Sequence, residues 1–245
     1  MRDRSEAARI GVVIYDGVEP IDIGGTVGVI SMARRILPGV DAVTIAASAG
    51  PVRLAGGLTL LAAHGFADAP ECDVVVVCGG PGWRDQVENA PMLGFLRGQA
   101  RERLASVCTG ALILAAAGLL DGVQATTRRR AAGTEAQSPL ALLPGLGRGV
   151  QAREALIVDA GIVTGGGVSL AIDATLYLIG RLYGDGARDE VARAIEYDRA
   201  WEANRQALDV LAPAYQRPPA TAAQAVSARE RRREPVSGNR QAGPE

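Results

Sequence analysis

A run of four consecutive valines, Val74 to Val77, most constrains what this chain can fold into. A strand with one face in water alternates apolar and polar side chains, and this segment does not. Both of its faces must therefore be buried, which is typical of a parallel sheet covered by helices on both sides. Residues 9–15 and 41–47 have the same apolar character and are expected to form two more central strands.

Helical patterns alternate with these strands along the chain. Helices are expected over residues 21–37, 109–118, 168–183 and 187–197, and a short one within 134–143. A strand is expected at residues 124–127, and residues 155–158 and 161–164 are expected to form a two-stranded element. Alternation of this kind predicts an α/β chain with a doubly wound fold, a three-layer α/β/α sandwich with a mostly parallel sheet.

Length and composition favour one large domain. The chain has 245 residues, of which 48% are hydrophobic, and this is enough for one substantial core. We expect that domain to span residues 1–215. Beyond Tyr215 the composition changes to Pro, Ala, Gln, Ser and Arg, so residues 216–245 are expected to be a disordered tail. A basic run at residues 229–233 is short and contains an acid, which makes it weak evidence for nucleic-acid binding.

Charge and residue counts limit the partners. A formal net charge of −1 provides no general attraction to nucleic acid or to an anionic membrane. The expected partners are a small-molecule substrate and a second copy of the chain. No apolar stretch approaches ~18 residues and no signal region precedes the first strand, so a cytoplasmic protein is expected. Three scattered cysteines and a single histidine, His64, indicate neither a disulfide framework nor a metal site, and no cofactor is expected.

Cys108 is the candidate nucleophile. It lies in Ser106-Val-Cys-Thr-Gly110, between a predicted strand and an alanine-rich helix. Small residues two before and two after the thiol resemble the nucleophile elbow of hydrolases, with sulfur in place of oxygen. A turn of this kind exposes the side chain at the carboxyl end of a strand, and the N-terminus of the following helix is expected to favour the thiolate. The alternative is a buried structural cysteine.

Several further motifs occur in a familiar order. They are Pro-Ile-Asp22-Ile-Gly-Gly, Cys78-Gly79-Gly80-Pro-Gly, Val107-Cys108-Thr109-Gly110-Ala, Gly118-Leu-Leu-Asp-Gly122, Ala125-Thr-Thr127 and Thr164-Gly-Gly-Gly167-Val-Ser-Leu-Ala-Ile-Asp173. With them the chain resembles the PfpI superfamily, the glutamine-amidotransferase-like group that contains the Parkinson's-disease deglycase. Within that group it is most similar to isonitrile hydratases and to the amino-terminal domains of AraC-type regulators.

The resemblance implies a flavodoxin-like sandwich that forms a homodimer, with the elbow cysteine hydrogen-bonded to a carboxyl group that maps to Asp22. For an isonitrile hydratase, the Cys108 thiolate would add to the terminal carbon, the nitrogen would be protonated, and water would release an N-substituted formamide. Asp22 would donate the proton and activate water, and Thr109 would orient substrate or water. Gly79 and Gly80 would supply N–H groups toward developing charge. Asp22 could instead be a surface or capping carboxylate, and the two glycines only a tight turn.

The pattern departs from the family after Thr126-Thr127, where relatives usually carry a histidine and this chain has Arg128. A guanidinium does not shuttle protons at neutral pH, but it stabilises a thiolate and binds carboxylates. If Arg128 enters the cleft, it should hold Cys108 ionised and favour anionic substrates. If it points outward, it belongs to a solvated cationic run.

Four functions therefore compete. The first is a cysteine-dependent hydratase or hydrolase of a small molecule, and its most specific version is an isonitrile hydratase. The second is a non-catalytic or redox-sensing dimer in which Cys108 is oxidised. The third is a deglycase- or glyoxalase-like activity. The fourth is a transcriptional regulator, which would need roughly a hundred residues more for an AraC-type DNA-binding domain.

Overall fold

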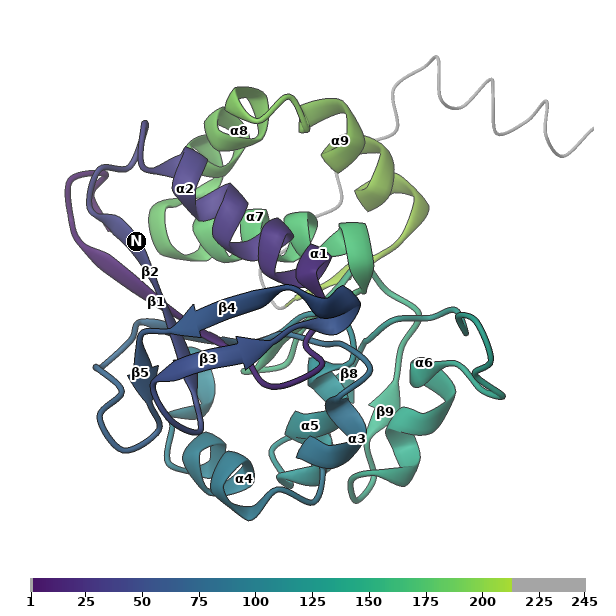
Figure 1. The fold of residues 1–245 in the computed structure, drawn as a ribbon. Coiled ribbons are helices and arrows are strands. Elements are labelled where there is room, and N and C mark those ends of the chain that lie inside the picture. Colours follow the sequence, from purple (N-terminus) through teal and green to yellow (C-terminus); the bar gives the residue numbers. More distant parts are fainter. Residues whose placement is uncertain (1, 213–245) are drawn as a thin grey trace, which may run out of the picture. The chain divides into compact units, whose positions relative to one another are not determined.

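An eight-stranded sheet forms the centre of the molecule (Figure 1). The computed structural model describes residues 2–212 of the chain. The strand order across the sheet is β12-β10-β11-β7-β6-β1-β2-β5. The strands are β1 (Ala8–Val13), β2 (Val40–Ala46), β5 (His64–Gly65), β6 (Val74–Val77), β7 (Leu104–Ser106), β10 (Ile157–Asp159), β11 (Val163–Gly165) and β12 (Val210–Leu211).

The valine run forms β6, in the middle of this sheet. Its four residues are buried, and it pairs in parallel with β1 on one side and with β7 on the other. Each of the other pairings is parallel too, except that β10 runs antiparallel to β11. The prediction of a mostly parallel α/β sheet is confirmed. The two-stranded element expected near residues 155–164 is this β10–β11 pair.

Helices cover both faces of the sheet, which completes the three layers (Figure 1). One face carries α1 (Pro20–Ile23), α2 (Val29–Ala33), α7 (Ala171–Tyr183), α8 (Asp185–Ala194) and α9 (Asp198–Ala207). The other carries α3 (Trp83–Gln86), α4 (Ala90–Arg97), α5 (Gly110–Ala116) and α6 (Pro139–Leu142). Two small sheets lie outside the main one. They are the hairpin of β3 (Gly50–Arg53) with β4 (Thr59–Ala62), and β8 (Gln124–Ala125) paired with β9 (Gln151–Ala152).

The first helical region is shorter than predicted and changes its winding. A π-helical segment, η1 (Gly24–Gly28), connects α1 to α2, and the helix ends at Ala33 rather than at Leu37. Single π-helical turns frequently mark functional sites. Here the segment begins two residues after Asp22, whose backbone oxygen accepts a hydrogen bond of 2.9 Å from the Thr26 hydroxyl.

Two C-terminal elements, α9 and β12, were not predicted from the sequence. The α9 segment is largely polar, and Trp201 is its one buried residue. A helix with so little apolar surface produces only a weak periodic signal. The expected tail at residues 216–245 lies outside the described residues.

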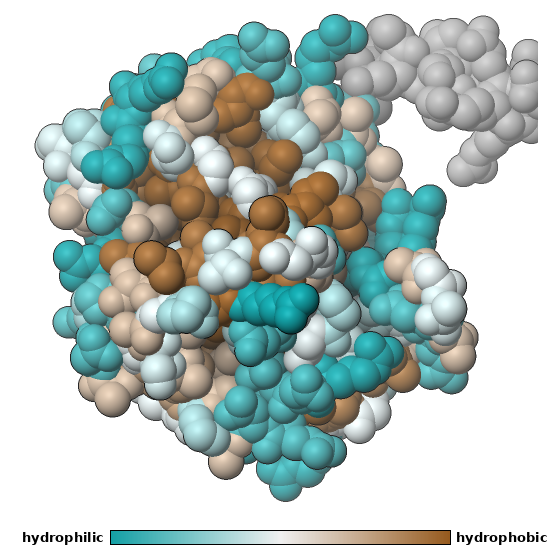
Figure 2. Space-filling view, in the orientation of Figure 1, coloured by the Kyte–Doolittle hydropathy of each residue, from teal (hydrophilic) through white to brown (hydrophobic). Residues whose placement is uncertain are grey.

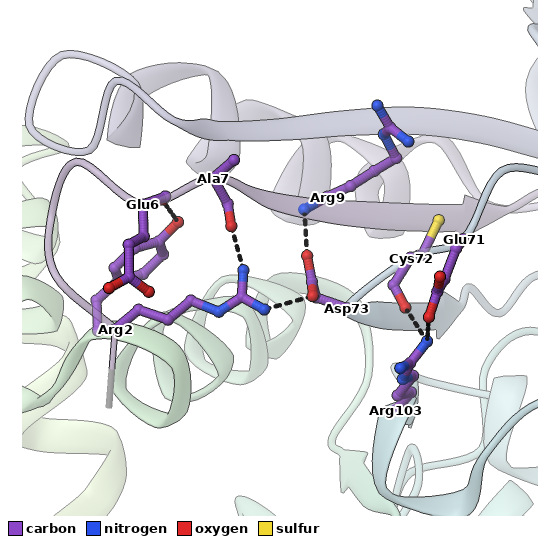
Figure 3. A network of polar contacts seen from close by, with 9 residues as sticks. Arg2, Glu6, Ala7, Arg9, Glu71, Cys72, Asp73 and Arg103 are labelled. Atoms are coloured by element: carbon purple, nitrogen blue, oxygen red, sulfur yellow. Dashed lines mark hydrogen bonds and ion pairs between the residues drawn. The ribbon is translucent and has the colours of Figure 1, made fainter.

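A polar network connects the N-terminal segment to the start of the central strands (Figure 3). Asp73 accepts a hydrogen bond of 2.8 Å from the backbone N–H of Arg9 and forms an ion pair with Arg2. Arg103 in turn pairs with Glu71. Asp73 directly precedes β6 and Arg103 directly precedes β7, so these contacts lie at the ends of the two strands opposite to Cys108.

Within residues 2–212, no helix combines the length and the apolar character that spanning a membrane requires.

Candidate active site

Cys108 lies where β7 ends and α5 begins, and its backbone is strained. Its φ angle of 52° is in the left-handed region, which non-glycine residues seldom adopt. The backbone N–H of Cys108 donates to the Gly166 oxygen at 3.0 Å, and its carbonyl accepts from the Thr127 hydroxyl at 2.5 Å. Contacts from two distant segments therefore hold the residue in this conformation, as is common for strained residues at functional sites.

Glycines make room for the elbow on both sides. A Cβ atom at Gly79 would lie 2.7 Å from the Cβ of Cys108 and 2.4 Å from the Thr109 nitrogen. At Gly110, a Cβ atom would lie 2.0 Å from the Val77 oxygen. All three distances are far below a normal contact, so β6 and the elbow approach closely only because these residues lack side chains.

Asp22 is fully buried and lies beside the thiol. Its Oδ2 accepts a hydrogen bond of 3.0 Å from the Gly79 N–H, whereas its buried Oδ1 has no hydrogen-bond partner among residues 2–212. Burial raises the pKa of the carboxyl to about 7, although interactions with Gly79, the Cys108 thiol and the Val168 N–H oppose the rise. The group therefore gains and loses a proton near neutral pH.

The Cys108 thiol is protonated in this environment. Burial raises its pKa to about 12, and the negative charge of Asp22 adds to the rise. The backbone N–H groups of Thr109 and Val168 and the charge of Arg128 lower the pKa, as the elbow geometry predicted, but burial outweighs them. The elbow therefore favours the thiolate in direction, as expected, but its effect on the pKa is smaller than that of burial. The proton must leave when the thiol reacts, and Asp22 is the neighbouring group that can take it.

Thr109 connects the elbow to the glycine turn. Its Oγ1 accepts a hydrogen bond of 2.8 Å from the Gly80 N–H. The Gly79 N–H is used in the same way by Asp22. From the sequence, the N–H groups of Gly79 and Gly80 were expected to point toward charge that develops on the substrate. In the structure they donate to Asp22 and Thr109 instead, and so position these two side chains.

The loop at residues 165–168 contributes a group that sequence reasoning missed. The N–H of Val168, whose φ is 61°, faces both Asp22 and Cys108 and lowers the pKa of each. A Cβ atom at Gly167 would lie 2.9 Å from the Cys108 sulfur and 2.6 Å from the Cβ of Arg128. Gly165, Gly166 and Gly167 directly precede the helix that the sequence predicts over residues 168–183. The run of glycines was the sequence signal for this part of the site, because only residues without side chains fit so close to the thiol.

Arg128 points into the site rather than outward. Its positive charge lowers the pKa of Cys108. Its guanidinium also binds Glu135 at 2.5 Å, and the two side chains are only 14% and 20% exposed. Glu135 was not a candidate from the sequence, because it lies in an irregular segment seven residues further along the chain.

These groups surround a cavity of about 420 Å³, open to solvent above the thiol. A cavity of this size holds a small organic molecule. It is lined by Glu19, Ile21, Gly80, Pro81, Trp83, Cys108, Thr109, Arg128, Ala132, Glu135 and Val168.

The remaining cysteines and the histidine lie apart from this cavity's lining. Cys72 and Cys78 are buried and free, and burial raises the pKa of both thiols. His64 lies in the edge strand β5, 3.6 Å from Asp68. Among residues 2–212, His, Cys, Asp and Glu side chains form no group of three or more that could hold a metal ion.

Comparison with known protein families matches residues 8–179 to the DJ-1/PfpI family. An isonitrile hydratase from Pseudomonas putida is 34% identical over 193 residues, which cover 78% of this chain and 79% of that protein. The HTH-type transcriptional regulator GbdR of Pseudomonas aeruginosa is 29% identical over 195 residues, and this chain spans 51% of its length.

Solved structures have the same fold. A ThiJ/PfpI family protein from Pseudomonas syringae has 27% identity and a TM-score of 0.65, over 79% of this chain and 76% of that one. DJ-1beta from Drosophila melanogaster has 20% identity and a TM-score of 0.64, over 78% and 98%.

Proposed function

This chain belongs to the DJ-1/PfpI family, and from that premise we propose that it is a cysteine-dependent hydratase of a small molecule, with an isonitrile as the substrate. Cys108 would be the nucleophile, and Asp22 would move the protons. The product would be an N-substituted formamide.

One observation carries the proposal: a buried carboxyl group with a pKa of about 7 adjoins a thiol at the floor of an open cavity. The thiol alone is protonated and unreactive. A neighbouring carboxylate provides a base for its proton within the same buried space, and a general base is most effective when its pKa lies near the working pH. The likeness to an isonitrile hydratase supplies the reaction class.

In the proposed reaction, the thiol proton and the water molecule supply every atom that the isonitrile gains. Asp22 takes the thiol proton as the Cys108 sulfur bonds to the terminal carbon of the isonitrile, and that carbon then receives the proton, which leaves a thioimidate. Water adds to the same carbon while the nitrogen gains a proton. The carbon–sulfur bond breaks, the water oxygen becomes the formamide carbonyl, and the remaining proton returns to the Asp22–Cys108 pair.

Backbone N–H groups support the charged stages. The Thr109 and Val168 N–H groups face the sulfur and stabilise negative charge on it. The Val168 N–H also faces Asp22. The Thr109 hydroxyl accepts from Gly80 and holds the wall of the cavity.

We also propose a homodimer. Four large apolar side chains are exposed in the described part of the chain, and two of them, Ile21 and Val168, border the cavity. Leu58 and Leu61 are the others. Figure 2 shows hydrophobic residues gathered over the face on which α1 and α7 lie. An apolar surface of this kind commonly marks a contact between protein chains. Light scattering on the purified chain would measure its mass in solution.

The hydratase is tested by incubating the full chain with an alkyl isonitrile and following formamide by NMR. Wild type should produce formamide, and Cys108→Ala should produce none. Absence of formamide with wild type, under conditions in which Cys108 remains reduced by mass spectrometry, would overturn the proposal. Oxidation of Cys108 by peroxide in such a sample would then favour the redox-sensing alternative.

A further inference from the structure

The Arg128–Glu135 ion pair occupies one wall of the cavity over Cys108. Arg128 Nη2 lies 2.5 Å from Glu135 Oε1, and Arg128 Nη1 donates to the Arg130 carbonyl at 2.5 Å. The other carboxylate oxygen of Glu135 accepts from the Ala132 N–H at 2.9 Å. The carboxylate is therefore fixed at two points, with the guanidinium on one side and the loop backbone on the other.

This arrangement places an internal carboxylate where an anionic ligand would bind. Arginine is the residue that best recognises carboxylates, because its planar guanidinium donates two parallel hydrogen bonds. Here Glu135 occupies Nη2 of Arg128 and the Arg130 carbonyl occupies Nη1, so both terminal nitrogens already donate to protein groups. The hydrogen bond from Arg128 lowers the pKa of Glu135, although burial opposes this, so Glu135 stays charged at neutral pH. A substrate carboxylate would have to displace it from both Arg128 and Ala132.

The other charged groups near the cavity place no second guanidinium in its lining. Glu19 lines the cavity, and its negative charge raises the pKa of Asp22. Arg84 lowers the pKa of Glu135, but its guanidinium lies 4.8 Å from the centre of the Trp83 ring, and Arg84 is not among the lining residues. The lining therefore carries two carboxylates and one guanidinium, a net charge of about −1 at neutral pH.

We propose that Glu135 is a specificity-determining residue: by neutralising Arg128 it restricts the cavity to uncharged substrates and excludes carboxylate-bearing ones. The inference rests on the proposed function in one respect, that the cavity over Cys108 is the substrate site. It names the class of molecule admitted there, and an isonitrile with a neutral substituent belongs to that class. It also reverses the preference for anions that an isolated Arg128 would produce.

The neighbouring ion pair provides a matched control. Arg129 lies 2.9 Å from Glu154, also in an arginine–glutamate pair of the same loop region. Its side chains are 36% and 60% exposed, and neither residue lines the cavity over Cys108. Removing the Glu154 charge changes the net charge of the protein by the same amount but leaves the cavity intact.

The experiment compares two alkylating reagents that differ in charge. Iodoacetamide and iodoacetate both form a carbon–sulfur bond with release of iodide, but only iodoacetate carries a carboxylate. The rate of each at Cys108 is measured by mass spectrometry of its peptide in wild type, Glu135→Gln and Glu154→Gln. The ratio of the two rates is normalised to the same ratio for free N-acetylcysteine. Changes in thiol reactivity cancel in this ratio.

Wild type should disfavour iodoacetate at Cys108 by at least about fivefold relative to the free thiol, because it meets negative charge within a few ångströms. Glu135→Gln should raise the normalised iodoacetate ratio by at least about tenfold, since a charge-assisted contact becomes available. Glu154→Gln should leave it unchanged. A wild-type ratio equal to that of the free thiol, or equal ratios in Glu135→Gln and Glu154→Gln, would overturn the inference.

A binding measurement keeps the test independent of thiol chemistry. Benzoate and benzamide have the same shape and differ in charge. Calorimetry should show benzoate binding to Glu135→Gln at least about tenfold more tightly than to wild type, with benzamide affected little. Equal benzoate affinity for both proteins would contradict the inference even if Cys108 does not alkylate. Charge selectivity without formamide production would contradict only the hydratase.

Discussion

Two fully buried aspartates, Asp22 in α1 and Asp173 in α7, differ in how their oxygens are used. Asp173 accepts a hydrogen bond of 2.9 Å from the Tyr197 hydroxyl and bonds of 3.1 and 3.2 Å from the Asn204 amide. Asp22 accepts one from the Gly79 N–H, and its Oδ1 has no such partner within residues 2–212. Burial raises the pKa of both, to about 7 for Asp22 and about 6 for Asp173.

The difference separates a structural carboxyl from one available for chemistry. The partners of Asp173 come from α9 and from the segment before it, so its oxygens connect the last helix to α7. Asp22 is held at one oxygen only, beside a thiol and an open cavity. An unpaired buried oxygen costs free energy. Its persistence beside Cys108 fits a group that exchanges a proton with the thiol and with substrate.

The largest expected effect is on activity. Asp22→Asn should lower kcat/KM for isonitrile hydration by about 100- to 10,000-fold, the range for losing a general acid–base group. Asp173→Asn should leave kcat/KM of the folded enzyme within about threefold of wild type. Initial rates of formamide formation measure both. Similar losses of kcat/KM in Asp22→Asn and Asp173→Asn would contradict the assignment of Asp22 to catalysis and Asp173 to structure.

The pH dependence of stability should identify each carboxyl. Since the folded-state pKa of Asp22 is raised to about 7, its stabilising protonation is fully present below about pH 4 and is lost as pH rises through 7. Wild type should therefore lose up to about 4 kcal/mol relative to Asp22→Asn between pH 4 and 8. Urea unfolding across this range gives the free energies. For Asp173 the corresponding loss, up to about 3 kcal/mol relative to Asp173→Asn, should be complete near pH 6, and a difference that does not change with pH would contradict the raised values.

Packing around the thiol should tolerate no added side chain. Gly167→Ala would place a methyl group 2.9 Å from the Cys108 sulfur, and overpacking of this kind costs about 1–3 kcal/mol. It should also slow alkylation of Cys108. Gly94→Ala in α4 is the matched control, because its Cβ would contact no atom within 4 Å and should stabilise by about 0.5–1 kcal/mol. Equal unfolding free energies for the two variants would show that the loop at residue 167 moves aside.

The smallest effect concerns the Asp173 cluster alone. Tyr197→Phe removes one hydroxyl donor to Asp173 and should lower the free energy of unfolding by about 1 kcal/mol. The pH profile of isonitrile hydration should not change. That profile should rise as pH passes through about 7 in both proteins, because the active Asp22–Cys108 pair retains one proton. A shift of the pH profile in Tyr197→Phe would show that the protonation of Asp22 depends on the contacts of Asp173.

The fold followed from local patterns, and its exceptions depend on contacts between segments distant in sequence. The unbroken apolar character of residues 74–77 correctly indicated a central parallel strand. The position of Cys108 between a strand and a helix could also be predicted from the sequence, because neighbouring residues determine a turn. The polar α9 escaped detection because it is held by Trp201 and by distant partners rather than by a wide apolar face.

The sequence by itself determined the layered α/β architecture and the place of the thiol at a strand end, because periodicity and turn residues act over a few positions. It also identified Asp22 and Arg128 as candidates through the family's motifs. Only the tertiary structure decided the rest: that the Val168 N–H faces the thiol, that Glu135 neutralises Arg128, and that Cys108 rests protonated. These depend on contacts between segments distant in sequence and on burial, which outweighs the local effect of a helix N-terminus.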